Sequence, residues 1–304
     1  MNRVLLVFTS IMFTSATALA DAPARCPLGL RLPAQIDENK PLVILIHGLD
    51  CNEGVFWRMG RELHDAGYAA TTFNYSSEQS ILEAGAALGN ALETLHKRFP
   101  RLRIDIVAHS MGGLVARDYI EGDGYAGGVD RLIMIAPPNH GSPWARLEFL
   151  ARWRLHTRNQ DDWRVTALVG APLSAAAKDL LPDSECINRL NARERRAGVR
   201  YTIIAGRFDD PGDAVGEWAR GLEAKAPDKL GAKWLMTKVA NVADKVNVKQ
   251  VLGEGDGVVT LESAKLDGVA DFIVLSSDHI TLCQGDATRG PSAWPAVKER
   301  LTHP

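Results

Sequence analysis

The segment at residues 103–120 constrains the fold of this chain more than any other part of it. It reads RIDIVAHSMGGLVARDYI: a short, mostly apolar run with β-branched residues, then a serine, then two glycines that open a stretch with helical spacing. A serine at a sharp strand-to-helix turn projects its hydroxyl out of the backbone, and small neighbours relieve the crowding of the turn. The segment therefore predicts a strand-turn-helix unit with Ser110 as a candidate nucleophile at its turn.

The five residues around Ser110 nearly match the G-x-S-x-G signature of such a turn. They read Ala108-His109-Ser110-Met111-Gly112, with alanine in place of the first glycine. Alanine keeps that position small, as the turn requires. A serine before a helix is also a common N-cap, which is the competing interpretation. The strand before the serine and the double glycine after it favour the nucleophile.

Continuous apolar runs elsewhere in the chain predict further buried strands. The first clear one is PLVILI at residues 41–46, which lacks the alternation of a half-exposed strand. Similar runs occupy residues 69–75, 130–136, 200–205 and 271–275, and helix patterns occupy 55–66 and 80–99. This alternation predicts an α/β fold with a doubly wound, mostly parallel sheet of about six strands. Residues 21–40 contain three prolines and are predicted to be an irregular lead-in.

Two long segments interrupt the alternation, at about residues 137–199 and 209–253. Both leave the sheet at strand ends on the side of Ser110. Because ligands of open α/β sheets bind beyond the carboxyl ends of the strands, these segments are predicted to be helical cap or lid insertions. A chain of 304 residues with 46% hydrophobic content can bury one large core, so residues 21–304 are predicted to form a single domain.

Residues 1–20 have the features of a secretory signal peptide. Arg3 precedes an apolar stretch that closes on Ala18-Leu19-Ala20, an A-x-A cleavage pattern. A membrane anchor is the alternative, but the stretch contains several Ser and Thr residues and is short for a bilayer span. The sequence therefore predicts a product that begins near residue 21 and is exported to the periplasm or the extracellular medium.

The cysteines and the net charge limit which cross-links, cofactors and partners the sequence predicts. Export favours two disulfides among Cys26, Cys51, Cys186 and Cys283, with the pairing open, and free buried thiols are the alternative. The spacing matches no zinc pattern, and neither a metal nor an organic cofactor is predicted. A net charge of -2 provides no basic surface for nucleic acid or an anionic membrane. No obligate protein partner is predicted.

A serine nucleophile needs a general base, and His279 is the best-placed histidine. It follows the last apolar run, within FIVLSSDHITL, and so falls at the carboxyl edge of the sheet on the side of Ser110. His109 adjoins the serine in sequence but is expected to point away from the turn.

The acid that orients the imidazole has two candidate positions. Asp209 and Asp210 follow the strand at residues 200–205, whereas Asp256 lies in the glycine-flanked turn GEGDGVV. Glycines suit a tight turn that delivers a carboxylate to one place. The residues alone favour Asp256 slightly and leave both positions open.

The oxyanion of an acyl-transfer reaction needs hydrogen-bond donors that are already in place. The backbone N–H of Met111, next after the serine, is one candidate. The other is the N–H of Leu49, in the loop after the first strand, where Gly48 allows close approach of the backbone.

Six motifs, in order, cover most of the chain after residue 20: LIHGL at 45–49, VAHSMGGLVAR at 107–117, APPNHGSPWA at 136–145, DLLPDSECINRLN at 179–191, GEGDGVVTLESA at 253–264 and SSDHITL at 276–282. Together they resemble the α/β-hydrolase-fold lipases and esterases of bacteria. The resemblance implies that Asp256, the aspartate of the D-G-V-V motif, is the acid of a triad with Ser110 and His279. It also implies a reduced sheet, because few residues precede the first parallel strand.

The resemblance further implies a serine hydrolase that cleaves lipid or other acyl esters through an acyl-enzyme, with transient contact to a lipid interface. A thioesterase or amidase with the same triad is the alternative, since triad geometry does not report the leaving group. A second alternative, from another class, is a non-catalytic, hydrolase-like partner protein. Lipase and esterase are not distinguished, because acyl chain length depends on the insertions.

Overall fold

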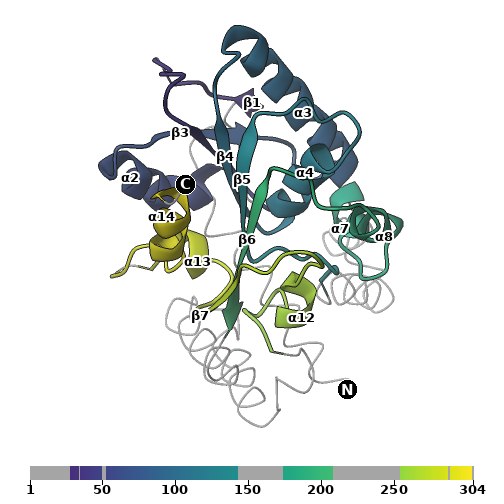
Figure 1. The fold of residues 1–304 in the computed structure, drawn as a ribbon. Coiled ribbons are helices and arrows are strands. Elements are labelled where there is room, and N and C mark those ends of the chain that lie inside the picture. Colours follow the sequence, from purple (N-terminus) through teal and green to yellow (C-terminus); the bar gives the residue numbers. More distant parts are fainter. Residues whose placement is uncertain are drawn as a thin grey trace, which may run out of the picture.

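The computed structural model describes residues 28–33, 35–49, 53–142, 174–207, 254–286 and 288–302. One seven-stranded sheet runs through it in the order β1-β3-β2-β4-β5-β6-β7 (Figure 1). The strands are β1 (Gly29–Leu30), β2 (Leu42–Ile46), β3 (Ala69–Asn74), β4 (Ile104–His109), β5 (Val129–Ile135), β6 (Arg200–Arg207) and β7 (Phe272–Ser276). Strands β2 to β7 are parallel to one another, which confirms the doubly wound, mostly parallel sheet.

The six predicted strands all form, with ends that differ by one or two residues. Every residue of β2 and β4 is buried, which explains the continuous apolar run of β2. In β4 the buried Asp105 interrupts the apolar run and pairs with Arg131 at 2.9 Å. The prediction for residues 21–40 was wrong at one point. Gly29 and Leu30 form β1, which pairs antiparallel with Asn74 and Phe73 of β3. A two-residue strand is too short to leave a periodic pattern in the sequence.

Helices cover both faces of the sheet (Figure 1). The helices are η1 (Glu53–Phe56), α2 (Trp57–Asp65), α3 (Ile81–Arg98), α4 (Met111–Ile120), α7 (Ala175–Asp179), α8 (Glu185–Asn191), α12 (Leu261–Ala264), α13 (Thr281–Gln284) and α14 (Trp294–Thr302). Helices α3 and α4 bury Leu88 and Val115 in one core cluster. Helices α2 and α14 bury Met59 and Val297 in the other. The sheet therefore separates two apolar layers.

Local capping explains why α3 begins where it does. The Ser80 side chain accepts a hydrogen bond from the backbone N–H of Glu83, and the Glu83 side chain accepts one from the backbone N–H of Ser80. This reciprocal arrangement satisfies two N–H groups at the start of the helix. The predicted helix at residues 80–99 is thereby confirmed. None of the helices in the described ranges is both long and apolar enough to cross a membrane.

The predicted insertions are only partly described. The end of the first one forms α7 and α8, which contact α3 and α4. Residues 143–173 and 208–253 lie outside the described residues, as does the predicted signal peptide at 1–20. The cap or lid role of the insertions and the single domain at 21–304 therefore stay predictions.

The expectation of two disulfides was wrong, because two bridges would require all four cysteines. Cys186 is a free thiol on α8, packed within the core cluster around α4. Its burial raises the pKa of the thiol to about 12, which keeps it protonated and unreactive. Cys283 is also buried, and Cys26 and Cys51 lie outside the described residues.

Candidate active site

Ser110 lies at the turn between β4 and α4 in a backbone conformation that serine rarely adopts. Its φ and ψ are 54° and -128°. Two hydrogen bonds hold this conformation: the Ser110 N–H donates to Ile135 O at 2.8 Å, and the Gly113 N–H donates to Ser110 O at 2.9 Å. Backbone strain of this kind persists only where the surroundings impose it, and it concentrates at functional sites. The predicted strand-turn-helix unit is present.

Two glycines bring the loop after β2 against this turn. A Cβ on Gly112 would lie 2.5 Å from the carbonyl oxygens of Ile46 and His47. A Cβ on Gly48 would lie 2.8 Å from the Cβ of Ser110. Real Cβ atoms do not approach that closely, so any larger residue at either position would displace the turn or the loop.

Asp256 and His279 are in direct contact. His279 Nδ1 lies 2.8 Å from Asp256 Oδ2, and the His279 backbone N–H donates to Asp256 O at 3.1 Å. The other carboxylate oxygen, Oδ1, accepts the N–H groups of Val258 at 2.9 Å and Val259 at 2.7 Å. An ionised carboxylate at this position assigns the imidazole proton to Nδ1 and leaves Nε2 as a base. Asp209 and Asp210 lie outside the described residues.

His109, the residue before Ser110, connects β4 to this pair. Its Nε2–H donates to the backbone oxygen of His279 at 2.9 Å, and the two rings lie 4.6 Å apart between centroids. The structure therefore brings the loop of His279 to the end of β4. No hydrogen bond between the Ser110 hydroxyl and the His279 ring occurs in the described part of the chain. His109 was not predicted as a site residue, because a contact with the loop after β7 leaves no mark in local sequence.

His109 gives the fold a pH dependence that can be measured. Burial lowers the pKa of His109 to about 3, so between about pH 6.5 and 3 the unfolded chain binds a proton there and the native chain does not. The free energy of unfolding should therefore fall as the pH drops through this window. His109→Gln keeps a side-chain N–H donor but cannot titrate. From pH 7 to 4.5, urea denaturation should show the wild type losing about 2 kcal/mol more than this variant.

The control is His64→Gln, which changes an exposed histidine of α2. It should reproduce the wild-type difference between the two pH values. Equal losses in the wild type and in His109→Gln would contradict the prediction.

The loop that carries Leu49 is held by Tyr75, at the end of β3. The Tyr75 hydroxyl donates to His47 O at 2.7 Å, and the two rings stack at 4.4 Å. In the ring of His47, Nδ1 lies 3.0 Å from Gly48 O. Burial of this imidazole lowers the pKa of His47. Met111 is the first residue of α4, a position whose N–H has no acceptor within the helix. Both predicted donors thus belong to segments that adjoin Ser110, and their role stays a prediction.

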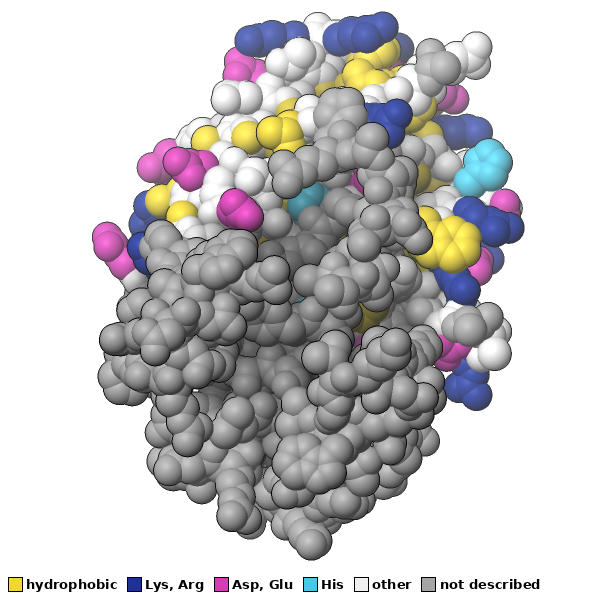
Figure 2. All heavy atoms as spheres, turned by 180° about the vertical axis from the view of Figure 1, so that it is seen from behind, with side chains coloured by type: hydrophobic (Ala, Val, Ile, Leu, Met, Phe, Trp, Pro, Cys, Tyr) yellow, Lys and Arg dark blue, Asp and Glu magenta, His cyan; other side chains and the backbone are white. Residues whose placement is uncertain are grey.

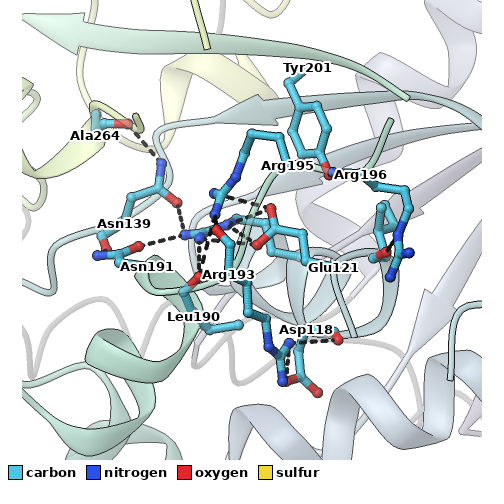
Figure 3. Close-up of polar contacts among 12 residues, drawn as sticks. Asp118, Glu121, Asn139, Leu190, Asn191, Arg193, Arg195, Arg196, Tyr201 and Ala264 are labelled. Atoms are coloured by element: carbon cyan, nitrogen blue, oxygen red, sulfur yellow. Dashed lines mark hydrogen bonds and ion pairs between the residues drawn. The ribbon is translucent and has the colours of Figure 1, made fainter. Parts of the chain in front are cut away.

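A buried ionic network surrounds Glu121, next after α4 (Figure 3). Arg117 is 0% exposed and pairs with Glu121 at 3.1 Å. Its other hydrogen bonds go to Asn139 Oδ1, Leu190 O and Asn191 Oδ1. Arg195 adds a second ion pair to Glu121 at 3.2 Å. The network joins the helix after Ser110 to α8 and to the segment after β5.

On the face drawn in Figure 2, the described residues do not concentrate charges of one sign. Figure 2 shows basic and acidic side chains interspersed on the described part of one face, with apolar side chains between them. Within the described ranges, no group of three or more His, Cys, Asp or Glu side chains is arranged to hold a metal ion. The described residues that could take part in a reaction are a buried histidine–carboxylate pair and a serine in a strained backbone conformation.

Comparisons with known proteins identify the family and the fold. The sequence model of the alpha/beta hydrolase family matches residues 43–286. None of the curated proteins searched matches the chain. Among solved structures, the mature lipase BlEst2 of Bacillus licheniformis is 20% identical, with a TM-score of 0.58 over 91% of this chain and 96% of that one. Lipase 1 of Pelosinus fermentans is 15% identical, with a TM-score of 0.54 over 87% and 99%. The structural likeness shows the fold, and the family model spans most of the sequence: this chain belongs to the alpha/beta hydrolase family.

Proposed function

We propose that this protein is an exported serine hydrolase that cleaves carboxylic esters, as a lipase or an esterase. The observation that carries the proposal is the contact of 2.8 Å between His279 Nδ1 and Asp256 Oδ2. The loop of His279 is bonded to His109, the last residue of the strand before Ser110. A buried carboxylate orients the imidazole and stabilises the imidazolium that forms during acyl transfer.

In the proposed reaction, Ser110 Oγ attacks the acyl carbonyl while His279 Nε2 takes its proton. The N–H groups of Leu49 and Met111 bind the oxyanion of the tetrahedral intermediate. His279 then gives the proton to the leaving alcohol, and an acyl-enzyme remains on Ser110. Water, activated by the same histidine, releases the acid and restores the serine.

The ester substrate is supported by two structural neighbours that are described as lipases. The proposed substrate is therefore a lipid or other acyl ester, and the protein is proposed to contact a lipid interface transiently. Export to the periplasm or the medium is proposed from the signal-peptide pattern of residues 1–20 alone.

A fluorophosphonate probe tests the proposal, because it forms a covalent bond only with an activated serine. Trypsin cleaves after Arg103 and Arg117, and the resulting peptide, IDIVAHSMGGLVAR, contains Ser110 as its one hydroxyl-bearing residue. We expect the adduct on this peptide in the wild type and no adduct in Ser110→Ala. A chain without labelling would be a non-catalytic, hydrolase-like protein, and labelling of another peptide would refute the assignment of Ser110.

Substrate class is tested with matched oxygen esters, thioesters and amides, and with acyl chains of increasing length in solution and as an emulsion. Faster turnover of oxygen esters is expected. Preference for thioesters or amides would overturn the ester proposal. Long chains at an interface would identify a lipase, and short soluble chains an esterase.

A further inference from the structure

The turn that carries Asp256 is short and closes on itself. Gly255 and Thr260 form an isolated β-bridge, and the Asp256 N–H donates to Val259 O at 3.2 Å. We call residues 255–260 the acid turn. Helix α12 follows it directly, and Thr260 caps that helix through its side chain.

Four consecutive residues, 139–142, lie along the acid turn and α12, and each makes a hydrogen bond to them. The bonds run from Asn139 Nδ2 to Ala264 O (2.8 Å), from His140 N to Ser263 O (3.0 Å), from Ser263 Oγ to Gly141 O, and from Ser142 Oγ to Val258 O (2.8 Å). Three of these bonds join the segment to α12, and one, from Ser142, reaches the acid turn itself.

The bond from Ser142 differs from the other three because it leads to the carboxylate. The peptide group between Val258 and Val259 accepts the Ser142 hydroxyl at its C=O end. At its N–H end, the same group donates to Asp256 Oδ1 at 2.7 Å. Since a trans peptide is planar and its two polar bonds point in opposite directions, the serine determines where the N–H points.

A chain of hydrogen bonds therefore runs from Ser142 through one peptide group to Asp256 and on to His279. All three side chains are buried, with exposed fractions of 5%, 2% and 7%. In such surroundings hydrogen bonds in series polarise one another, and a buried donor or acceptor left without a partner is costly.

The segment at 139–142 is itself anchored to the helix that starts after Ser110. Arg117 Nη1 donates to Asn139 Oδ1 at 2.9 Å, and Asn191 Nδ2 donates to Asn139 O at 2.9 Å. Figure 3 shows Asn139 between Ala264 and Asn191, with bonds to both. The helix of the nucleophile and the turn of the acid are thus tied to the same segment.

We propose that Ser142 is a positioning residue that holds the carboxylate of Asp256 in register with His279 through the Val258–Val259 peptide group. This inference rests on the proposed function, because it gives Ser142 a task only in a reaction that uses Asp256 and His279. In this role Ser142 acts through the Val258–Val259 peptide group rather than on the substrate.

The test compares Ser142→Ala with Ser263→Ala in the whole protein. Both variants remove a buried hydroxyl that joins residues 139–142 to the acid turn or α12, but only Ser142 is connected to the carboxylate. For a soluble p-nitrophenyl ester, we expect Ser142→Ala to lower kcat about tenfold with little change in KM, the effect of one weakened hydrogen bond in the transition state. Ser263→Ala should keep kcat within about twofold of the wild type.

Two further measurements separate positioning from a general loss of stability. Ser142→Thr retains the hydroxyl and should restore kcat, and Ser142→Cys, a weak donor, should give an intermediate value even if the alanine variant does not fold. In proton NMR, the low-field signal of the His279 Nδ1 proton should shift in Ser142→Ala and stay in place in Ser263→Ala.

An unchanged kcat in both Ser142→Ala and Ser142→Cys, or equal losses in Ser142→Ala and Ser263→Ala, would overturn the inference while an active, labelled wild type leaves the proposed function standing. A wild type that neither hydrolyses esters nor reacts with the fluorophosphonate would overturn the proposed function instead.

Discussion

Replacing Asp256 with asparagine is expected to lower kcat for ester hydrolysis about ten-thousandfold, the effect of trapping the histidine in the wrong tautomer. The structure dictates how the new amide must sit. The N–H groups of Val258 and Val259 both point at Oδ1, so the amide oxygen takes that position. Its NH₂ group then faces His279 Nδ1 and donates to it. The imidazole is left with its proton on Nε2, where it cannot accept one from Ser110.

Steady-state kinetics on a p-nitrophenyl ester measure this effect, and a thermal melt close to that of the wild type shows that the fold is kept. Asp267→Asn is the matched control, because Asp267 is exposed in the loop before β7, and it should leave kcat unchanged. Asp209→Asn and Asp210→Asn should also remain active. An active Asp256→Asn variant beside an inactive one at either of these positions would move the acid to the end of β6.

Replacing Arg117 with methionine is expected to reduce the free energy of unfolding by about 3–5 kcal/mol, the range for removing one partner of a buried ion pair. Arg117 and Glu121 both have side chains that are 0% exposed. Burial raises the pKa of Glu121 even beside Arg117, and without Arg117 this buried carboxylate keeps only its ion pair with Arg195. The variant also removes the guanidinium N–H groups that donate hydrogen bonds to Asn139 Oδ1 and Leu190 O.

Urea denaturation of Arg117→Met and Arg103→Met compares a buried with an exposed ion pair. Arg103 pairs with Asp130 at 3.4 Å and its side chain is 54% exposed, so its loss should change the free energy of unfolding by less than about 1 kcal/mol. Similar losses in the two variants would show that the Arg117 network adds no more stability than a surface pair.

Local pattern was sufficient to predict the parallel strands of the sheet and the strand-turn-helix unit that carries Ser110. Strand β2 is buried on both faces, so its sequence is an uninterrupted apolar run that stands out from its surroundings. The turn at Ser110 needs small residues on either side, which leaves a signature in five consecutive positions. The contact between Asp256 and His279 agrees with the acid that the resemblance selected, which the residues alone had left open.

The contacts that support these residues could not be predicted in the same way. Ser142 and Val258 are separated by 116 positions in the chain, and His109 and His279 by 170. Each of these bonds depends on how β4, β5 and β7 are placed in the sheet, and a single serine or histidine in a loop is compatible with many arrangements. Arg117 left one signal, an arginine in a mostly apolar helix, but its partners Asn139 and Leu190 come from distant segments.

For each of the two undescribed segments, 143–173 and 208–253, the described residues that flank its two ends lie close together. The Ser142 N–H donates to Leu180 O at 2.9 Å, near the two ends of residues 143–173. At the other insertion, a Cβ on Gly206 would lie 2.7 Å from the Cβ of Asp256, so the ends of residues 208–253 also meet. Closing a longer loop between ends that already meet adds little free energy, about 0.6 kcal/mol per doubling of its length. Residues 143–173 and 208–253 can therefore be lengthened or exchanged at a small cost in free energy, without rebuilding the fold around Ser110.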